Sequence, residues 1–187
     1  AGTAVAAAVL AAQVAGGAVP RIALGGWAPP LGIALATDGL AAALIVTTAL
    51  VMGAVALVAR QSMAPDRAGA RTAFGFWPLM LTLWAALNAV FASRDLFNLY
   101  VGIELLSLAA IGLVALGGTA GALAAAMRYM LYALAGSLLY LAGVALIYAA
   151  HGALDIDLLA ARRPAGTDAL ALALMTAGLM AKTALFP

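Results

Sequence analysis

Two ionisable side chains lie inside apolar stretches of the chain, where they could carry chemistry. Glu104 is the only glutamate and lies within the apolar run 96–116. Lys182 is the only lysine and lies within the apolar run 169–186. Counting ~1.5 Å per residue places Glu104 roughly 12 Å along its helix, well inside a hydrocarbon layer ~30 Å thick. An ionisable group at that depth is costly unless it faces protein, water or a partner, and such residues mark ion or proton pathways.

The strength of the interaction between Glu104 and Lys182 depends on the distance between the two charges. Lys182 lies roughly 20 Å along its helix from Asp168, and Gly178 one turn earlier leaves room beside the ammonium group. At an effective dielectric near 20, opposite charges attract by about 2.8 kcal/mol at ~6 Å and by about half of that at ~12 Å. A small movement would then change which group holds a proton, and the pair would titrate as one unit. Two structural alternatives stay open: Glu104 only holds the bundle together, or Lys182 extends to an interface.

Three further residues are candidates for accessory roles. Tyr100 and Ser107 lie at helical spacing from Glu104, so that the face around the carboxylate is partly polar. Arg128 lies just inside the fifth apolar span, where it could extend to the interface, stabilise a helix end or pair with an acid.

Two positions bear on the ends of helices. Thr37 can cap the second span with Asp38 in its first turn, and this helix-start role competes with a role for Asp38 as a proton carrier. Pro187 follows Lys182 by five residues and would kink or break a helix there. Broken helices beside ionisable groups are a feature of transporters.

Other reactive residues point to no enzyme chemistry. Arg94 and Asp95 are expected to form an interfacial cap pair, and His151, next to Gly152, is expected to be solvated. The chain has no cysteine and one histidine, and it has no Ser-His-Asp arrangement or phosphate-binding loop. No metal or cofactor site is expected.

Composition fixes the class of protein. Hydrophobic residues make up 67% of the chain and charged residues 9%, against about 25% charged residues in soluble domains. The formal charge of +2 does not suggest a nucleic-acid partner. We expect an all-α polytopic membrane bundle, forming a single transmembrane domain over residues 1–187 in a lipid bilayer. Its expected spans are 3–18, 38–59, 74–91, 96–116, 123–150 and 168–187.

The connections between the spans add local expectations. The short turn at residues 92–94 requires antiparallel neighbouring helices, and Gly136 with Gly143 forms a small-residue stripe for close helix contact. Residues 154–161 could form an amphipathic turn at the interface. The arginine-rich loop 60–71 weakly favours a cytoplasmic position for its side. Both ends look cut, so that the chain is expected to be part of a larger protein.

Several stretches of the sequence resemble a known family. Residues 95–107 resemble the fifth transmembrane helix of the proton-translocating, antiporter-like subunits of respiratory complex I and of Mrp-type sodium/proton antiporters. Residues 128–129, 135–148 and 152–155 are similar to the sixth helix and the loop after it, and residues 181–187 look like the start of the broken seventh helix. Residues 25–33 and 38–40 most resemble the D-type branch of the Mrp subunits.

This resemblance implies a bundle of about fourteen helices with two inverted repeats, of which the present spans would be the second to the seventh. The family's glutamate in helix five and lysine in helix seven would be Glu104 and Lys182, a charge pair that couples proton movement in one half-channel to its neighbours. The loop of residues 25–31 would lie outside. The family often has lysine where Arg128 stands, and arginine does not release protons readily, which argues against a shuttle role there.

The sequence therefore predicts a membrane subunit that conducts protons within a multi-subunit cation/proton antiporter. Its expected partners are other membrane subunits of the same complex, protons and, as a second candidate ion, sodium. Its expected location is the bacterial inner (cell) membrane. One alternative is a proton-pumping subunit of an NADH-quinone oxidoreductase or a membrane hydrogenase. Another is a non-conducting structural scaffold, in which Glu104 and Lys182 are merely structural.

Overall fold

The computed structural model describes residues 2–63 and 69–183. The chain is mostly helical, with a small two-stranded sheet near its beginning. In chain order the elements are α1 (Gly2–Ala15), β1 (Arg21–Ala23), a short 3-10 turn (Leu24–Gly26), β2 (Ala34–Ala36), α2 (Gly39–Ser62), α4 (Ala70–Ala92), α5 (Leu96–Ala115), α6 (Ala120–His151), α7 (Ile156–Ala160) and α8 (Asp168–Lys182).

Four of the described helices, α2, α4, α5 and α6, are long and apolar enough to cross a membrane. Their outer faces carry large apolar side chains that no other part of the described chain covers. Leu50, Leu57 and Phe74, for example, are 71%, 73% and 82% exposed. Helices satisfy their own backbone groups, so such a surface suits hydrocarbon rather than water. The chain has the predicted class of fold, an all-α membrane bundle.

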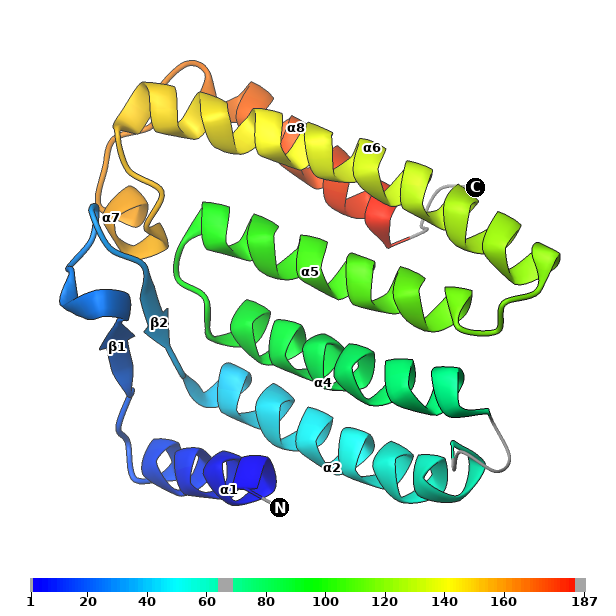
Figure 1. Cartoon of the computed structure of the whole chain (residues 1–187). Coiled ribbons are helices and arrows are strands. Elements are labelled where there is room, and N and C mark those ends of the chain that lie inside the picture. Colours follow the sequence, from blue (N-terminus) through cyan, green and yellow to red (C-terminus); the bar gives the residue numbers. More distant parts are fainter. Residues whose placement is uncertain (1, 64–68, 184–187) are drawn as a thin grey trace.

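The long helices lie side by side in sequence order (Figure 1). Helix α1 contacts α2, α2 contacts α4, α4 contacts α5, and α5 contacts α6, while α8 packs along α6. The short connections after α4 and after α5 make α4, α5 and α6 antiparallel neighbours, and the ends of the helices gather into two opposite groups (Figure 1). The sheet and α7 lie at one of these ends, beside the start of α5 and the end of α6 (Figure 1).

Polar side chains mark the beginnings of the helices. Asp38 caps α2 by accepting from the backbone N–H of Ala41 at 2.9 Å, so the cap is Asp38 and the expectation of Thr37 was wrong. Asp95 caps α5 and Asp155 caps α7 in the same way. Each cap satisfies one of the N–H groups that the first turn of a helix leaves without a partner.

The sheet joins the first half of the bundle to the second. Strands β1 and β2 are antiparallel, with Arg21 opposite Ala36. Within β2, Leu35 forms a bridge with Ser93, in the turn between α4 and α5. A second bridge joins Asp95, just before α5, to Asp155, just before α7. One hydrogen-bonded layer therefore links the ends of α2, α4, α5 and α6.

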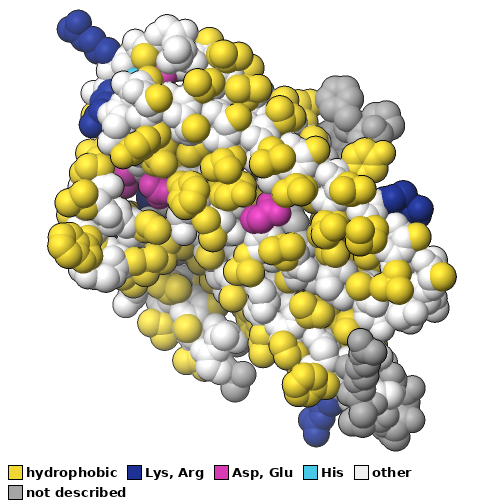
Figure 2. Space-filling view, turned by 45° about the horizontal axis from the view of Figure 1, so that its top comes forward, with side chains coloured by type: hydrophobic (Ala, Val, Ile, Leu, Met, Phe, Trp, Pro, Cys, Tyr) yellow, Lys and Arg dark blue, Asp and Glu magenta, His cyan; other side chains and the backbone are white. Residues whose placement is uncertain are grey.

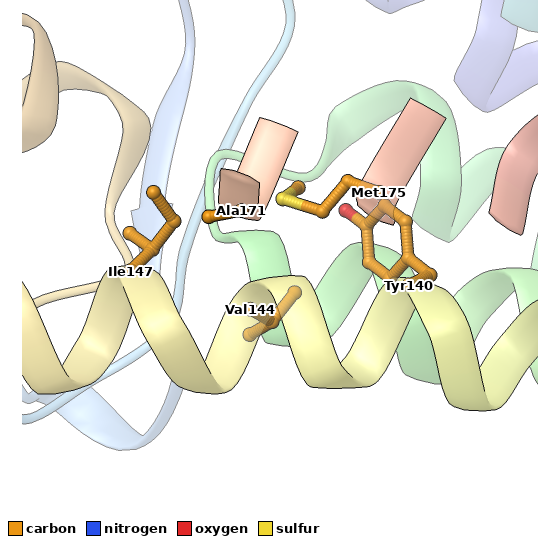
Figure 3. Packing of buried hydrophobic residues seen from close by; sticks show 5 residues of the cluster. All are labelled: Tyr140, Val144, Ile147, Ala171 and Met175. Atoms are coloured by element: carbon orange, nitrogen blue, oxygen red, sulfur yellow. The ribbon is translucent and has the colours of Figure 1, made fainter. Parts of the chain in front are cut away.

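The tightest packing is between α6 and α8. Figure 3 shows Tyr140, Val144 and Ile147 on α6 directed towards Ala171 and Met175 on α8, forming one buried cluster. Small residues let the two helices approach this closely. A Cβ atom at Gly143 would lie 2.5 Å from the carbonyl oxygen of Ala171. The small-residue stripe predicted on this helix is thus a helix contact surface.

Candidate functional site

Glu104 and Lys182 meet between α5 and α8. The Nζ atom of Lys182 lies 2.9 Å from Oε2 of Glu104, close enough for a charge-assisted hydrogen bond. The same ammonium group donates to the hydroxyl of Ser107 at 3.0 Å and approaches the carbonyl oxygen of Ile103 at 3.4 Å. All three donor directions of the lysine therefore have an oxygen on α5.

A second serine reaches the carboxylate from the third helix of the site. The hydroxyl of Ser137 on α6 donates to Oε2 of Glu104 and also lies 2.9 Å from the carbonyl oxygen of Ala133. A hydroxyl both donates and accepts, so Ser137 can serve an ionised or a protonated carboxyl group. Ser137 was not predicted as a residue of the site, because nothing in its local sequence shows that it faces Glu104.

The site is buried unevenly. The side chain of Lys182 is 7% exposed and that of Glu104 is 22% exposed, whereas Ser137 is almost completely enclosed. Glu104 lies near the middle of α5, far from both helix ends. A partly accessible carboxylate, a buried ammonium and two hydroxyl groups form a short hydrogen-bonded chain in an apolar surrounding. Such a chain can hold a proton and pass it between neighbouring oxygens.

Two glycines bring α8 close enough for Lys182 to reach α5. A Cβ atom at Gly178 would lie 2.5 Å from the carbonyl oxygen of Gly136, and a Cβ atom at Gly136 would lie 2.8 Å from the carbonyl oxygen of Gly178. The Cβ position at Gly136 is also 3.1 Å from Cγ of Lys182, so the lysine stem crosses α6 at this glycine. Larger residues would push the helices apart and move the ammonium group away from the carboxylate.

The accessory candidates from the sequence are dispersed. Ser107 is in the site, but Tyr100 packs against the Tyr140 cluster, and no hydrogen bond joins it to the charge pair among the described residues. Arg128 is exposed near the start of α6, and within the described ranges 2–63 and 69–183 it forms no ion pair. Pro187, and with it the predicted helix break, lies outside the described residues.

Asp38 belongs to the sheet end of the bundle rather than to the charge pair. Its carboxylate accepts from Ala41 and lies 2.8 Å from the Arg94 guanidinium. The backbone N–H of Ala41, and after it the charge of Arg94, hold the pKa of Asp38 below its ordinary value. The expected pair of Arg94 with Asp95 is replaced by this contact, because Asp95 turns instead to cap α5.

His151 is not solvated, contrary to expectation. Its Nε2 atom lies 2.9 Å from the carboxylate of Asp168, and the two side chains are 10% and 20% exposed. The Arg162 guanidinium donates to the backbone carbonyl of His151. The sequence did not indicate this contact, because His151 and Asp168 lie 17 positions apart in the chain, with α7 between them.

Comparison with known proteins defines the class to which this fold and site belong. Residues 93–187 match the model of the family described as "NADH:quinone oxidoreductase/Mrp antiporter, TM". The chain is 41% identical over 175 residues to the N subunit of the NADH-quinone oxidoreductase of Desulforudis audaxviator, a match that covers 89% of this chain and 34% of that protein. It is 35% identical over 138 residues to the D subunit of the Na(+)/H(+) antiporter of Bacillus subtilis, covering 74% of this chain and 27% of that protein.

A solved structure shows the same fold. In the archaeal membrane-bound sulfane sulfur reductase complex, one chain superposes with a TM-score of 0.86 at 31% identity, covering 95% of this chain and 36% of that one. The present chain thus spans about a third, or less, of the length of the relatives it matches. It is an integral membrane protein of the inner (cell) membrane type, with bacterial relatives. It belongs to the transmembrane family of NADH:quinone oxidoreductase and Mrp antiporter subunits.

Proposed function

We propose that this chain is part of a membrane subunit that conducts protons within a multi-subunit cation/proton antiporter. The contact between Glu104 and Lys182 carries this proposal: the two charges lie 2.9 Å apart in the interior of an otherwise apolar bundle. Buried ion pairs contribute little to stability compared with well-packed apolar residues of similar size. A pair maintained at this depth therefore favours a role in proton transfer.

The chemistry assigned to each residue follows from its contacts. Glu104 takes up and releases the proton, since its carboxylate is the more accessible member of the pair. Lys182 stabilises the ionised carboxylate and competes with it for the proton. Ser107 orients the ammonium group of Lys182, and Ser137 orients the carboxylate of Glu104. A change of protonation at one of these two charged groups therefore affects the other. Protons, and sodium as the exchanged ion, are the substrates of this proposal.

A second candidate function uses the same pair in a different complex. The N subunit of an NADH-quinone oxidoreductase is 41% identical to this chain, which favours a proton-pumping role coupled to electron transfer in partner subunits. Both functions require other membrane subunits as partners. Ion-driven proton exchange in vesicles without an electron donor would support the antiporter, whereas proton uptake that depends on an electron donor and acceptor would support the oxidoreductase.

The test of proton conduction is Glu104→Gln in the full-length protein, expressed with its partner subunits. Glutamine keeps the size of the side chain, and its amide oxygen can still accept from Ser137 and Lys182, but the amide cannot carry the proton. We expect proton transport in vesicles to fall by about a hundredfold or more, the effect of removing a group that exchanges protons directly. The matched control is Asp157→Asn, which removes an exposed carboxylate paired with Arg21 at the sheet end and should leave transport unchanged.

Assembly must be measured on the same samples. If the Glu104→Gln complex assembles fully and transports protons at the normal rate, the pair is a structural contact and the chain is a scaffold. An assembled complex that no longer transports protons supports conduction through Glu104.

A further inference from the structure

A cavity of about 330 Å³ opens at the sheet end of the bundle, away from the charge pair. Its walls come from the start of α5, the end of α6, helix α7 and the start of α8. Leu96, Ile147, Leu159, Leu172 and Met175 make most of the lining apolar. Its depth is therefore suited to hydrocarbon, and water would find few partners there.

Two arginines lie at the mouth of this cavity. Arg162 and Arg163 are exposed and lie just after Ala161, the C-terminal cap residue of α7. Neither forms an ion pair with a carboxylate of residues 2–63 or 69–183, although Arg162 donates to the backbone carbonyl of His151. Figure 2 shows basic side chains and the histidine together at one edge of the molecule, next to a surface of apolar side chains.

The acidic groups nearby are already engaged. Asp168 also lines the cavity, but its carboxylate contacts His151 and accepts from the backbone N–H of Ala165 at 2.8 Å. Asp157 on α7 forms its ion pair with Arg21. The positive charges of Arg162 and Arg163 therefore remain available to an anion at the cavity mouth.

We propose that this cavity binds an anionic phospholipid, with its phosphate on Arg162 and Arg163 and an acyl chain against the apolar wall. Guanidinium groups bind phosphate oxygens in a bidentate way, and basic pockets between helix ends are suited to anionic headgroups. The position fits this occupant, because the ends of membrane helices lie at the level of the headgroups. The site is separate from Glu104 and Lys182 and does not depend on their role.

The test measures lipid association with the full-length protein, purified with its partner subunits. Binding of phosphatidylglycerol and of phosphatidylcholine is compared by native mass spectrometry. We expect phosphatidylglycerol to be retained preferentially, and the double variant R162Q/R163Q to weaken that retention by about thirtyfold. R163Q alone leaves the Arg162 contact to His151 in place and should weaken it by about fivefold. R60Q removes an exposed arginine at the end of α2 and is the control without effect.

A second variant tests the apolar wall separately. L172W places a larger side chain at the lining and should reduce retention of phosphatidylglycerol while both arginines stay in place. Equal retention of the two lipids by the unaltered protein would overturn the proposal, as would a loss in R60Q as large as that in R162Q/R163Q. Displacement of the lipid by millimolar inorganic phosphate, unchanged binding in L172W, or a partner protein crosslinked at residue 163 would overturn it too.

Discussion

At the scale of single residues, the carboxyl group of the charge pair has a hydrogen-bond partner for its ionised and for its protonated form. Glu104 shares its carboxylate between an ammonium group and the hydroxyl of Ser137, and it is partly accessible. Loss of the lysine charge would still leave a hydroxyl that donates to the carboxylate or accepts from its protonated form. In an ion pair without such a neighbour, neutralisation of one partner would leave the other charge buried without a partner.

How much of this site could be predicted from sequence differs from residue to residue. Glu104 and Lys182 were identifiable because a single acid and a single amine interrupt long apolar runs. Ser137 was not, because serine is common in tightly packed membrane helices and its partner lies 33 residues away. His151 was misjudged for a related reason: a histidine at a helix end is usually solvated, and only the chain reversal through α7 brings Asp168 to it.

Asp38 gives a prediction about stability in acid. Its pKa in the folded protein lies below 3.8, owing first to the N–H of Ala41 and then to Arg94. The folded state therefore favours the ionised form, and this contribution is present above pH 3.8 and lost as the pH falls through the lower folded value. We expect Asp38→Asn, which keeps a capping side chain but removes the charge, to lower the melting temperature at neutral pH.

The difference between the unaltered protein and Asp38→Asn should shrink as the pH falls below 3.8. Melting curves of both proteins in detergent, recorded over a series of pH values, measure this. A gap that stays constant over the series would show that the charge of Asp38 does not contribute.

At the scale of elements, the position of α8 against α6 determines whether the charge pair can form. Gly136 and Gly178 face each other, and further along the interface Gly143 lies against Ala171. Lys182 is the last residue of α8, so a small outward shift of this helix would move its ammonium group away from α5. Packing between these two helices and the geometry of the charge pair are therefore linked.

The substitution Gly178→Ala tests this link. The added Cβ atom would lie 2.5 Å from the carbonyl oxygen of Gly136 and 2.7 Å from the backbone N of Tyr140, so α8 must move. We expect a loss of about 1–3 kcal/mol of stability, as for overpacking in a core, together with reduced proton transport. Thermal melting in detergent and transport in vesicles measure the two effects.

The matched control is Gly53→Ala in the middle of α2, where a Cβ atom would meet nothing within 4 Å. Alanine is the better helix former, so this variant should be neutral or more stable by up to about 1 kcal/mol. If both alanine variants behave alike, close approach at Gly178 is not required.

The helices themselves were the most predictable elements. Continuous apolar runs between loops rich in glycine, proline or arginine identify them, because a backbone in hydrocarbon must satisfy its own hydrogen bonds. The pairing of β1 with β2 was not predicted, since strands of three residues carry too little pattern. The segment expected as an amphipathic turn at residues 154–161 contains α7.

At the scale of the whole molecule, the two ends of the bundle differ. One end carries the sheet, α7 and the ion pairs of Asp38, Asp157 and Asp168. The opposite end carries the loop between α5 and α6. Among residues 2–63 and 69–183, the layer of strands and bridges ties the first half of the bundle to the second at the sheet end.

The arginine-rich loop 60–71, expected on the cytoplasmic side, gives a prediction about orientation. The chain has no cysteine, so a full-length protein cleared of cysteines elsewhere can be labelled at single introduced sites. Leu31→Cys, at an 83% exposed position in the sheet connection, should react with a membrane-impermeant maleimide added to intact cells. Ala120→Cys, at the opposite end, should react only after the membrane is opened. The reverse pattern would show that the sheet end faces the cytoplasm.

The most direct measurement is infrared difference spectroscopy of the full-length protein in lipid, following the carboxylic-acid C=O stretch through a pH titration. If Glu104 carries the proton, a protonated carboxyl band appears as the pH falls, is absent in Glu104→Gln, and titrates with a different midpoint in Lys182→Met. If no band assignable to Glu104 appears under any condition that supports transport, its carboxylate stays ionised throughout, and Glu104 is not the proton carrier.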